Sequence, residues 1–294
     1  MVVLCSACQS GEGRPPTTPT SVTSTTPTPT LPATASTPTT STSSPTAATS
    51  SPTAANGTTC TTTADLILVA AQDELHRLDP LPFSSLVEDD SATDLSDDYK
   101  VLVRKAQTDA QVAGCGRELL SRRLLESSER LVARGPVAIA TKANLVEALA
   151  SNIASALGSA PPIDDVSVEV VGLVAPTAQS LVDCVAVGRA WIALHQALID
   201  AVGIVPLDRY LRGDTMRSVD LRQNADNVGL RFTGTELDAS IEILNDRGDE
   251  LGCTDETLAR ALIEDGDTLR ATTPTGVAFK ADQITTAELL VIGF

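Results

Sequence analysis

Two histidines are the side chains of this sequence best suited to acid–base chemistry, because imidazole is the side chain that ordinarily titrates near neutral pH. His195 follows Trp191 by one helical turn, and His76 is the only other histidine. The two are far apart in the sequence but could meet in the fold, with Asp73 or Asp200 to orient a ring. We favour a buried imidazole satisfied by a backbone carbonyl over a catalytic base or a metal ligand.

Acidic residues gather in two regions that could attract a metal ion. Residues 88–98 hold two acidic clusters but no glycine, which a calcium loop needs for its sharp turn. We therefore predict a solvated loop in which Ser96 caps the following helix. The second group lies at expected hairpin turns: Asp246, Asp249, Glu250, Asp265 and Asp267. Aspartate is common in turns, so calcium remains an alternative there, the metal content stays unknown, and we expect no cofactor.

Common catalytic signatures are missing from the sequence. It contains no Gly-x-Ser-x-Gly, no His-Glu-x-x-His and no Gly-x-x-x-x-Gly-Lys. A glycosidase would need only two suitably spaced carboxylates, but aromatic residues make up just 2% of the chain and offer few platforms for sugars. A hydrolase that uses His195 or a pair of carboxylates therefore remains only an alternative.

The N-terminal residues Leu4-Cys5-Ser6-Ala7-Cys8 place small side chains directly before a cysteine. This run resembles the lipobox of bacterial lipoproteins, in which the signal peptidase needs small residues and the cysteine then carries the lipid. The match departs from the family at Cys5, where leucine is usual, and in lacking the basic and apolar regions of a signal peptide. A true gene start further upstream would explain both departures. The resemblance implies that Cys8 carries a lipid. Residues 1–14 would then form a truncated signal and lipobox head.

A Thr, Ser, Pro and Ala-rich stretch with no charged residue runs from residue 15 to residue 63. It has little apolar area to offset the entropy of ordering, so we predict a disordered, extended stalk. At roughly 3.1 Å per residue, about 50 residues would reach on the order of 150 Å. The composition is typical of O-glycosylated stalks, and Asn56-Gly57-Thr58 is an N-glycosylation acceptor. An unmodified flexible linker is an equally good interpretation.

Four cysteines remain if Cys8 is lipidated: Cys60, Cys115, Cys184 and Cys253. Their wide spacing matches no zinc module, and an even number in an exported chain predicts two disulfides. We expect Cys60 to pair with Cys115, which would fasten the end of the stalk to the helices. Cys184 would pair with Cys253 and join the two halves of the body, which should melt separately after reduction.

Hydrophobic spacing divides the body into two predicted domains. Residues 64–212 contain helical periodicity, with helices expected over 66–78, 99–134 (bent at Gly114-Cys115-Gly116), 141–157 and 177–202. Residues 166–174 are expected as a strand, with a short helix as the alternative. Residues 213–294 alternate apolar and polar residues at 230–233 and 240–244, have turn signals at 245–248, 265–266 and 274–276, and end in an apolar run at 289–292. A short helix capped by Thr254 would separate the strands. The predicted fold class is α+β: a helical bundle followed by a small antiparallel β domain.

Charge and hydropathy limit the partners of this body. The net charge is −17, so polyanions such as nucleic acid and anionic membrane surfaces are unfavourable partners. No uninterrupted apolar run of about 20 residues suggests a membrane-spanning helix, which leaves a lipid anchor as the only expected contact with a membrane. The sequence therefore predicts an extracytoplasmic, envelope-tethered or surface protein with a non-enzymatic binding or structural role towards another envelope or extracellular component. An exported hydrolase is the alternative.

Overall fold

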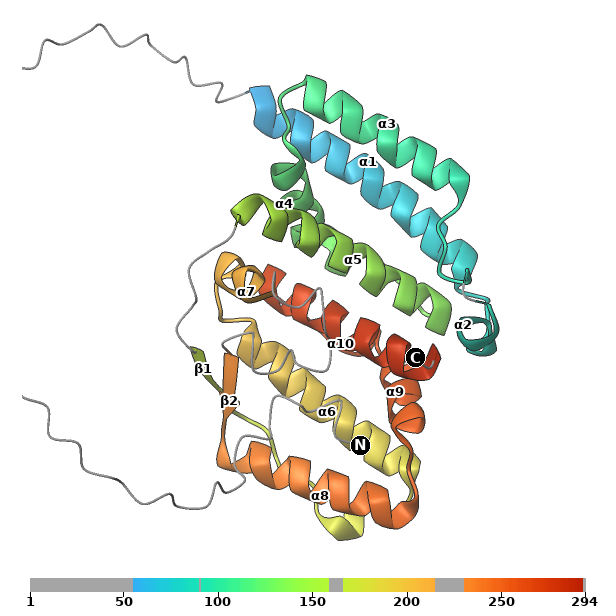
Figure 1. The fold of residues 1–294 in the computed structure, drawn as a ribbon, viewed down its shortest axis with the longest axis vertical. Coiled ribbons are helices and arrows are strands. Elements are labelled where there is room, and N and C mark those ends of the chain that lie inside the picture. Colours follow the sequence, from blue (N-terminus) through green and yellow to red (C-terminus); the bar gives the residue numbers. More distant parts are fainter. Residues whose placement is uncertain (1–54, 90, 159–165, 215–229, 293–294) are drawn as a thin grey trace, which may run out of the picture.

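The computed structural model describes residues 55–89, 91–158, 166–214 and 230–292. Ten α-helices and two short strands make up these ranges, and helices account for 73% of them (Figure 1). Cys8 and residues 15–54 of the predicted stalk lie outside the described residues. The fold class is therefore predominantly helical, and the predicted antiparallel β domain is wrong.

The first four helices form one end of the molecule: α1 (Ala55–Leu78), α2 (Ser84–Glu88), α3 (Asp97–Val112) and α4 (Arg117–Ser127). Helix α1 starts earlier than predicted, so residues 55–63 belong to it and not to an extended stalk. Its buried residues Cys60, Ala64 and Ile67 form a small core with residues of the α3–α4 region, which explains why these turns are ordered. Ser96 caps α3 as expected, with its side chain accepting a hydrogen bond from the Tyr99 backbone N–H.

The middle of the chain matches the predicted elements closely. A 3₁₀ turn, η2 (Ser128–Arg130), leads to α5 (Pro136–Leu157), which has proline in its first turn. Strand β1 (Val166–Glu169) and a second 3₁₀ turn, η3 (Ala178–Ser180), precede α6 (Cys184–Val202) and α7 (Leu207–Asp214). The Asp183 side chain caps α6 by accepting from the Ala186 backbone N–H. The predicted strand is thus confirmed over Val166–Glu169 and the long apolar helix over Cys184–Val202. The bent helix predicted over 99–134 is instead two helices, α3 and α4, followed by η2.

The last part of the chain is helical where strands were predicted. After strand β2 (Leu230–Thr233) come α8 (Thr235–Leu251), α9 (Asp255–Glu264) and α10 (Pro274–Ile292). Strand β2 pairs with β1 in parallel, with Val166 opposite Leu230 and Glu169 opposite Thr233. Only α9, capped by Thr254, was expected as a helix in this region.

Two segments predicted as strands lie in helices, α8 and α10. The pattern that suggested a strand covers only a short window in each, whereas the helical spacing of buried residues extends well beyond it. In α8 the buried residues Leu237, Ile241 and Leu244 recur at helical spacing, so residues 240–244 do not form a strand and the predicted turn at 245–248 lies inside the helix. In α10 the apolar run at 289–292 is the last turn of a helix that begins at Pro274. The tight turn predicted at 274–276 is therefore the start of α10.

Helix α10 lies at the centre of the molecule. Figure 1 shows α3, α1, α5, α10, α6 and α8 running side by side, with α10 between α5 and α6. One buried hydrophobic cluster extends from Ala71 to Val291 and includes residues from both predicted domains. The predicted boundary near residue 213 falls inside α7, so the two halves share one core.

Helix α6 is the most apolar long helix of the described ranges. Its length and composition alone would suit a membrane span, and half of its most apolar window is buried inside the fold. It packs against α8, α9 and α10. Those contacts account for its apolar character.

Candidate functional site

The four cysteines of the body form two disulfides in the expected pairs. Cys60 near the start of α1 bonds to Cys115 in the α3–α4 turn, and both are almost fully buried. Cys184 at the start of α6 bonds to Cys253, just after α8. Gly252 ends α8 with a positive φ of 70°, a conformation that favours glycine, and so directs Cys253 towards α6.

His195 is buried in the core and does not line a cleft described here. It is only 2% exposed, and its ring centroid lies 6.1 Å from that of Trp191, the neighbour predicted from the sequence. Burial lowers the pKa of His195 to about 4, against a smaller opposing effect of a hydrogen bond with Gln283. Its Nδ1 has no partner among the described residues, so the predicted backbone carbonyl partner is missing on that side.

The other residues considered for histidine chemistry do not join His195. His76 is exposed on α1, where its Nε2 is 3.0 Å from the Gln72 side-chain nitrogen. Helices α5 and α10 lie between α1 and α6 (Figure 1). Asp200 accepts a hydrogen bond from Gln196 on the exposed side of α6. Asp73 is exposed on α1, a helix that carries neither His195 nor Asp200. A base that combines His195 with Asp73 or Asp200 is therefore not assembled.

A pocket of about 190 Å³ opens between α5, α10 and the loop that follows α9. Apolar side chains from the facing helices form much of its wall: Ile139, Ala143 and Val146 of α5, and Val277, Ala281 and Ile284 of α10. Charged side chains line the rest: Glu129, Lys142, Asp267, Arg270 and Lys280. This combination of apolar wall and convergent polar groups is typical of a small-molecule site.

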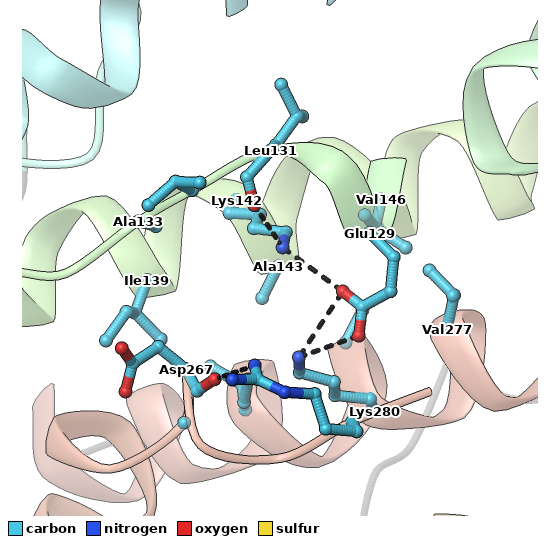
Figure 2. Close-up of a pocket in the computed structure, with 15 residues that line it drawn as sticks. Glu129, Leu131, Ala133, Ile139, Lys142, Ala143, Val146, Asp267, Val277 and Lys280 are labelled. Atoms are coloured by element: carbon cyan, nitrogen blue, oxygen red, sulfur yellow. Dashed lines mark hydrogen bonds and ion pairs between the residues drawn. The ribbon is translucent and has the colours of Figure 1, made fainter. Parts of the chain in front are cut away.

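Glu129 is the centre of the charged part of the pocket. Figure 2 shows Lys142 and Lys280 both reaching its carboxylate, one from each of the facing helices α5 and α10, with Nζ–O distances of 3.2 and 3.0 Å. Glu129 Oε1 also accepts the Ala271 backbone N–H at 3.1 Å. The carboxylate therefore joins η2, α5, α10 and the α9–α10 loop, and both of its oxygens are occupied.

The two lysines are satisfied to different extents. Lys280, buried at 7% exposure, donates to Glu129 and to the Leu269 carbonyl oxygen at 2.7 Å. Lys142 donates to Glu129 and to the Leu131 carbonyl oxygen at 2.7 Å. Each ammonium group has three hydrogens. Lys142 uses two of them within the part of the chain that is described, and its side chain keeps 15% exposure to the pocket.

Burial and charge act in opposite directions on these groups. Burial alone would raise the pKa of Glu129, but the two lysines hold it below its usual value. Burial lowers the pKa of Lys142, and the nearby cations Lys280 and Arg270 lower it further, against the opposing effect of Glu129. Glu129 is therefore the group that favours the charged form of Lys142, against burial and the two neighbouring cations.

The predicted acidic clusters do not form a metal site in the described ranges. Across residues 55–89, 91–158, 166–214 and 230–292, no three His, Cys, Asp or Glu side chains are grouped closely enough to hold a metal ion. Asp246, Asp249 and Glu250 lie within α8, whereas Asp265 and Asp267 follow α9. Asn56 lies in the first turn of α1, and its side chain is outside the described residues.

Sequence reasoning missed this pocket, although a signal for it was present. Lys142 is the only cation of α5, and Lys280 the only cation of α10. A cation in a mostly apolar helical run is costly to bury unless it finds a partner. Glu129 stands among many charged residues between Arg117 and Arg134, and nothing in its spacing connects it to residues 13 and 151 positions away.

The chain matches no protein family model, and neither the curated proteins nor the solved structures contain a match to it.

Proposed function

We propose that the chain is an extracytoplasmic, envelope-tethered binding protein without enzymatic activity. A lipid on Cys8 anchors it, the Thr, Ser and Pro-rich stalk extends it from the membrane, and the helical body binds a small component of the envelope or its surroundings. The pocket between α5 and α10 is the observation that carries the binding role.

The location is supported by three independent features. Cys8 follows small residues as in a lipobox, and the uncharged stalk begins seven positions later, at Pro15. The body contains two disulfides, which persist in oxidising compartments and are rare in a reducing cytosol. Each feature is explained by export to the cell surface.

A binding role fits the pocket better than hydrolysis does. Glu129 has both oxygens occupied by lysines and a backbone N–H, so it is poorly placed to accept a proton from water. His195 is buried and is not among the residues that line the pocket. A concave, partly apolar site with fixed polar groups needs no further chemistry to hold a ligand.

Fractionation of cells that produce the full chain tests the location. We expect the protein in the detergent phase of an envelope extract, with an intact mass increased by a diacylglyceryl group, and we expect protease added to intact cells to remove it. Cys8→Ala should move the protein to the aqueous phase with both disulfides intact. Recovery of the unmodified protein in the cytosol, with the four cysteines of the body as free thiols, would overturn the proposal.

A fragment screen by methyl NMR tests the binding role. The full chain would be titrated with neutral, anionic and cationic molecules of about the size of benzene. We expect at least one class to shift the methyl signals of Val277 and Ile284 while those of Leu120, in the small core at the other end, stay fixed. A screen in which no pocket methyl shifts would contradict the binding role.

A further inference from the structure

We infer that the pocket between α5 and α10 binds a small monocarboxylate, with Lys142 and Arg270 holding the carboxylate and the facing helices holding an apolar body. This inference rests on the proposed binding function and names its ligand class.

The first observation is the charge of the pocket wall. Three cations, Lys142, Arg270 and Lys280, face two acids, Glu129 and Asp267, which leaves one positive charge in excess. The whole chain has a net charge of −17. A positive pocket is therefore a local exception in an acidic protein, and it favours one negative charge from a ligand.

The second observation is which cations have hydrogens to offer. Lys280 is buried and donates to Glu129 and to the Leu269 carbonyl oxygen. Its role is therefore to hold Glu129 in position. Lys142 has one hydrogen without an acceptor among the described residues. Arg270 is exposed, and its guanidinium donates only to the Asp267 carbonyl oxygen in that part of the chain. Lys142 and Arg270 are thus the groups that can donate to an arriving anion.

The third observation is that the Glu129 carboxylate is already fully engaged and cannot also accept the free hydrogens of Lys142 and Arg270. Its Oε1 accepts from Lys280 and Ala271, and its Oε2 accepts from Lys142. Charge-assisted hydrogen bonds to a carboxylate are among the strongest that a protein makes. A ligand carboxylate beside Lys142 and Arg270 would accept the N–H groups of these two side chains that Glu129 does not accept.

The size and the wall of the pocket define the rest of the ligand. An engineered cavity of about 150 Å³ binds benzene, so a pocket of about 190 Å³ has room for a body of this size and a carboxylate. Ile139, Val146, Val277 and Ile284 provide apolar surface for that body. We therefore expect an aromatic or short aliphatic acid, and a bare inorganic anion would leave the apolar wall unfilled.

Calorimetric titration of the full, disulfide-bonded chain with benzoate and with its neutral isostere benzamide tests the inference. We expect benzoate to bind at least tenfold more tightly than benzamide, and added salt to reduce this difference. Lys142→Met should remove most of the preference for benzoate over benzamide. Arg270→Gln, at the exposed rim, tests the same preference in a variant whose substituted side chain is not buried. Lys105→Met, on the exposed face of α3, is the matched control and should bind as the unmodified chain does.

The outcomes separate the ligand class from the binding function. Equal binding of benzoate and benzamide, or tighter binding of benzylammonium, would overturn the monocarboxylate and leave a small-molecule site. Tight binding of inorganic phosphate without benzoate binding would also overturn it. If none of these probes binds and no pocket methyl shifts, both the inference and the proposed binding function fail.

Discussion

Glu129 is the residue on which the charged part of the pocket depends. It is the acidic partner of both Lys142 and Lys280 in the ion pairs of this cluster, and all three side chains are largely buried. Removing one member of such a group leaves the other charges buried without compensation, which is more damaging than losing an exposed pair. The network is therefore a structural requirement of the pocket as well as part of its surface.

Glu129→Gln should destabilise the protein by about 3 kcal/mol, since it leaves two ammonium groups facing each other without their shared anion. Urea unfolding followed by circular dichroism measures this change. Glu126→Gln is a matched control on α4, where Glu126 pairs with Arg123 at the surface, and should cost less than about 1 kcal/mol. Equal losses for the two variants would show that the Glu129 cluster contributes no more than a surface pair.

His195 should make the protein less stable as the pH falls from 6.5 to about 4. Its folded-state pKa is lowered to about 4 from 6.5 by burial, so in this window the unfolded chain binds a proton that the folded chain does not. The stability due to neutral His195 is complete above pH 6.5 and lost as the pH falls, by on the order of 3 kcal/mol in total.

The slope of unfolding free energy against pH measures this effect. This slope is proportional to the number of protons that the chain takes up on unfolding. His195→Gln should lower that number by up to one between pH 6.5 and 4, whatever the substitution costs in overall stability. In the folded protein the ring signals of His195 should stay those of the neutral form from pH 7 to pH 5. A ring that titrates near pH 6.5 in the folded state would contradict the burial of this side chain.

At the level of elements, two helix N-caps differ only in the space around them. Gly135 precedes α5 and Gly116 precedes α4, both with negative φ and extended ψ. A Cβ at Gly135 would lie 2.1 Å from the Asp79 carbonyl oxygen, whereas a Cβ at Gly116 would meet nothing within 4 Å. The Asp79 carboxylate also accepts the backbone N–H groups of Arg134 and Gly135, so the end of α1 and the start of α5 are tightly joined.

Gly135→Ala should therefore cost about 3 kcal/mol, because the backbone of α1 must move to relieve the overlap. Gly116→Ala should cost less than about 1 kcal/mol, the usual difference between glycine and alanine at an N-cap. Thermal unfolding of the two variants gives the comparison. Similar melting temperatures would mean that α1 and α5 are not packed as closely as the structure indicates.

The sequence predicted the elements whose periodicity is long or whose boundaries are marked. Helix α3 has its Ser96 cap, α6 has a continuous apolar face, and β1 has alternating valines. In α8, Ile241 and Ile243 alternate with polar residues over five positions, and this local pattern concealed the longer stripe of Leu237, Ile241 and Leu244. Short windows cannot separate the two periods when β-branched residues lie in a helix.

The pocket was less accessible to sequence reasoning than the fold. Its residues come from η2, α5, α10 and the loop after α9, and they meet because α10 packs against α5. Predicting a turn at 274–276 and a strand at 289–292 in place of one helix left no wall on which to put Lys280. A site that depends on one long-range helix pair is lost when either helix is misassigned.

At the scale of the molecule, α10 makes the body a single folding unit. It lies between α5 and α6 (Figure 1), and the main buried cluster includes residues from Ala71 to Val291. The sequence led us to expect two halves that melt separately after reduction. A shared core predicts one transition instead, because neither half keeps its buried surface without α10.

Reduction of both disulfides should lower the melting temperature without splitting the transition. The bonds close loops with sequence separations of 55 and 69 residues, for which chain entropy gives on the order of 4 kcal/mol each. Calorimetry of the oxidised and reduced chains should show one endotherm in each case, with equal calorimetric and van't Hoff enthalpies.

A substitution in α10 extends the same test to both halves. Ile284→Ala removes a side chain that is 3% exposed and should cost about 3 kcal/mol, whereas Ile292→Ala at the exposed end of α10 should cost less than about 1 kcal/mol. Trp191 fluorescence follows α6, and far-ultraviolet circular dichroism follows all helices. For Ile284→Ala the two probes should shift together to the same lower midpoint. If the fluorescence midpoint stays fixed while the dichroism midpoint falls, α6 and its neighbours unfold independently and the single-core description is wrong.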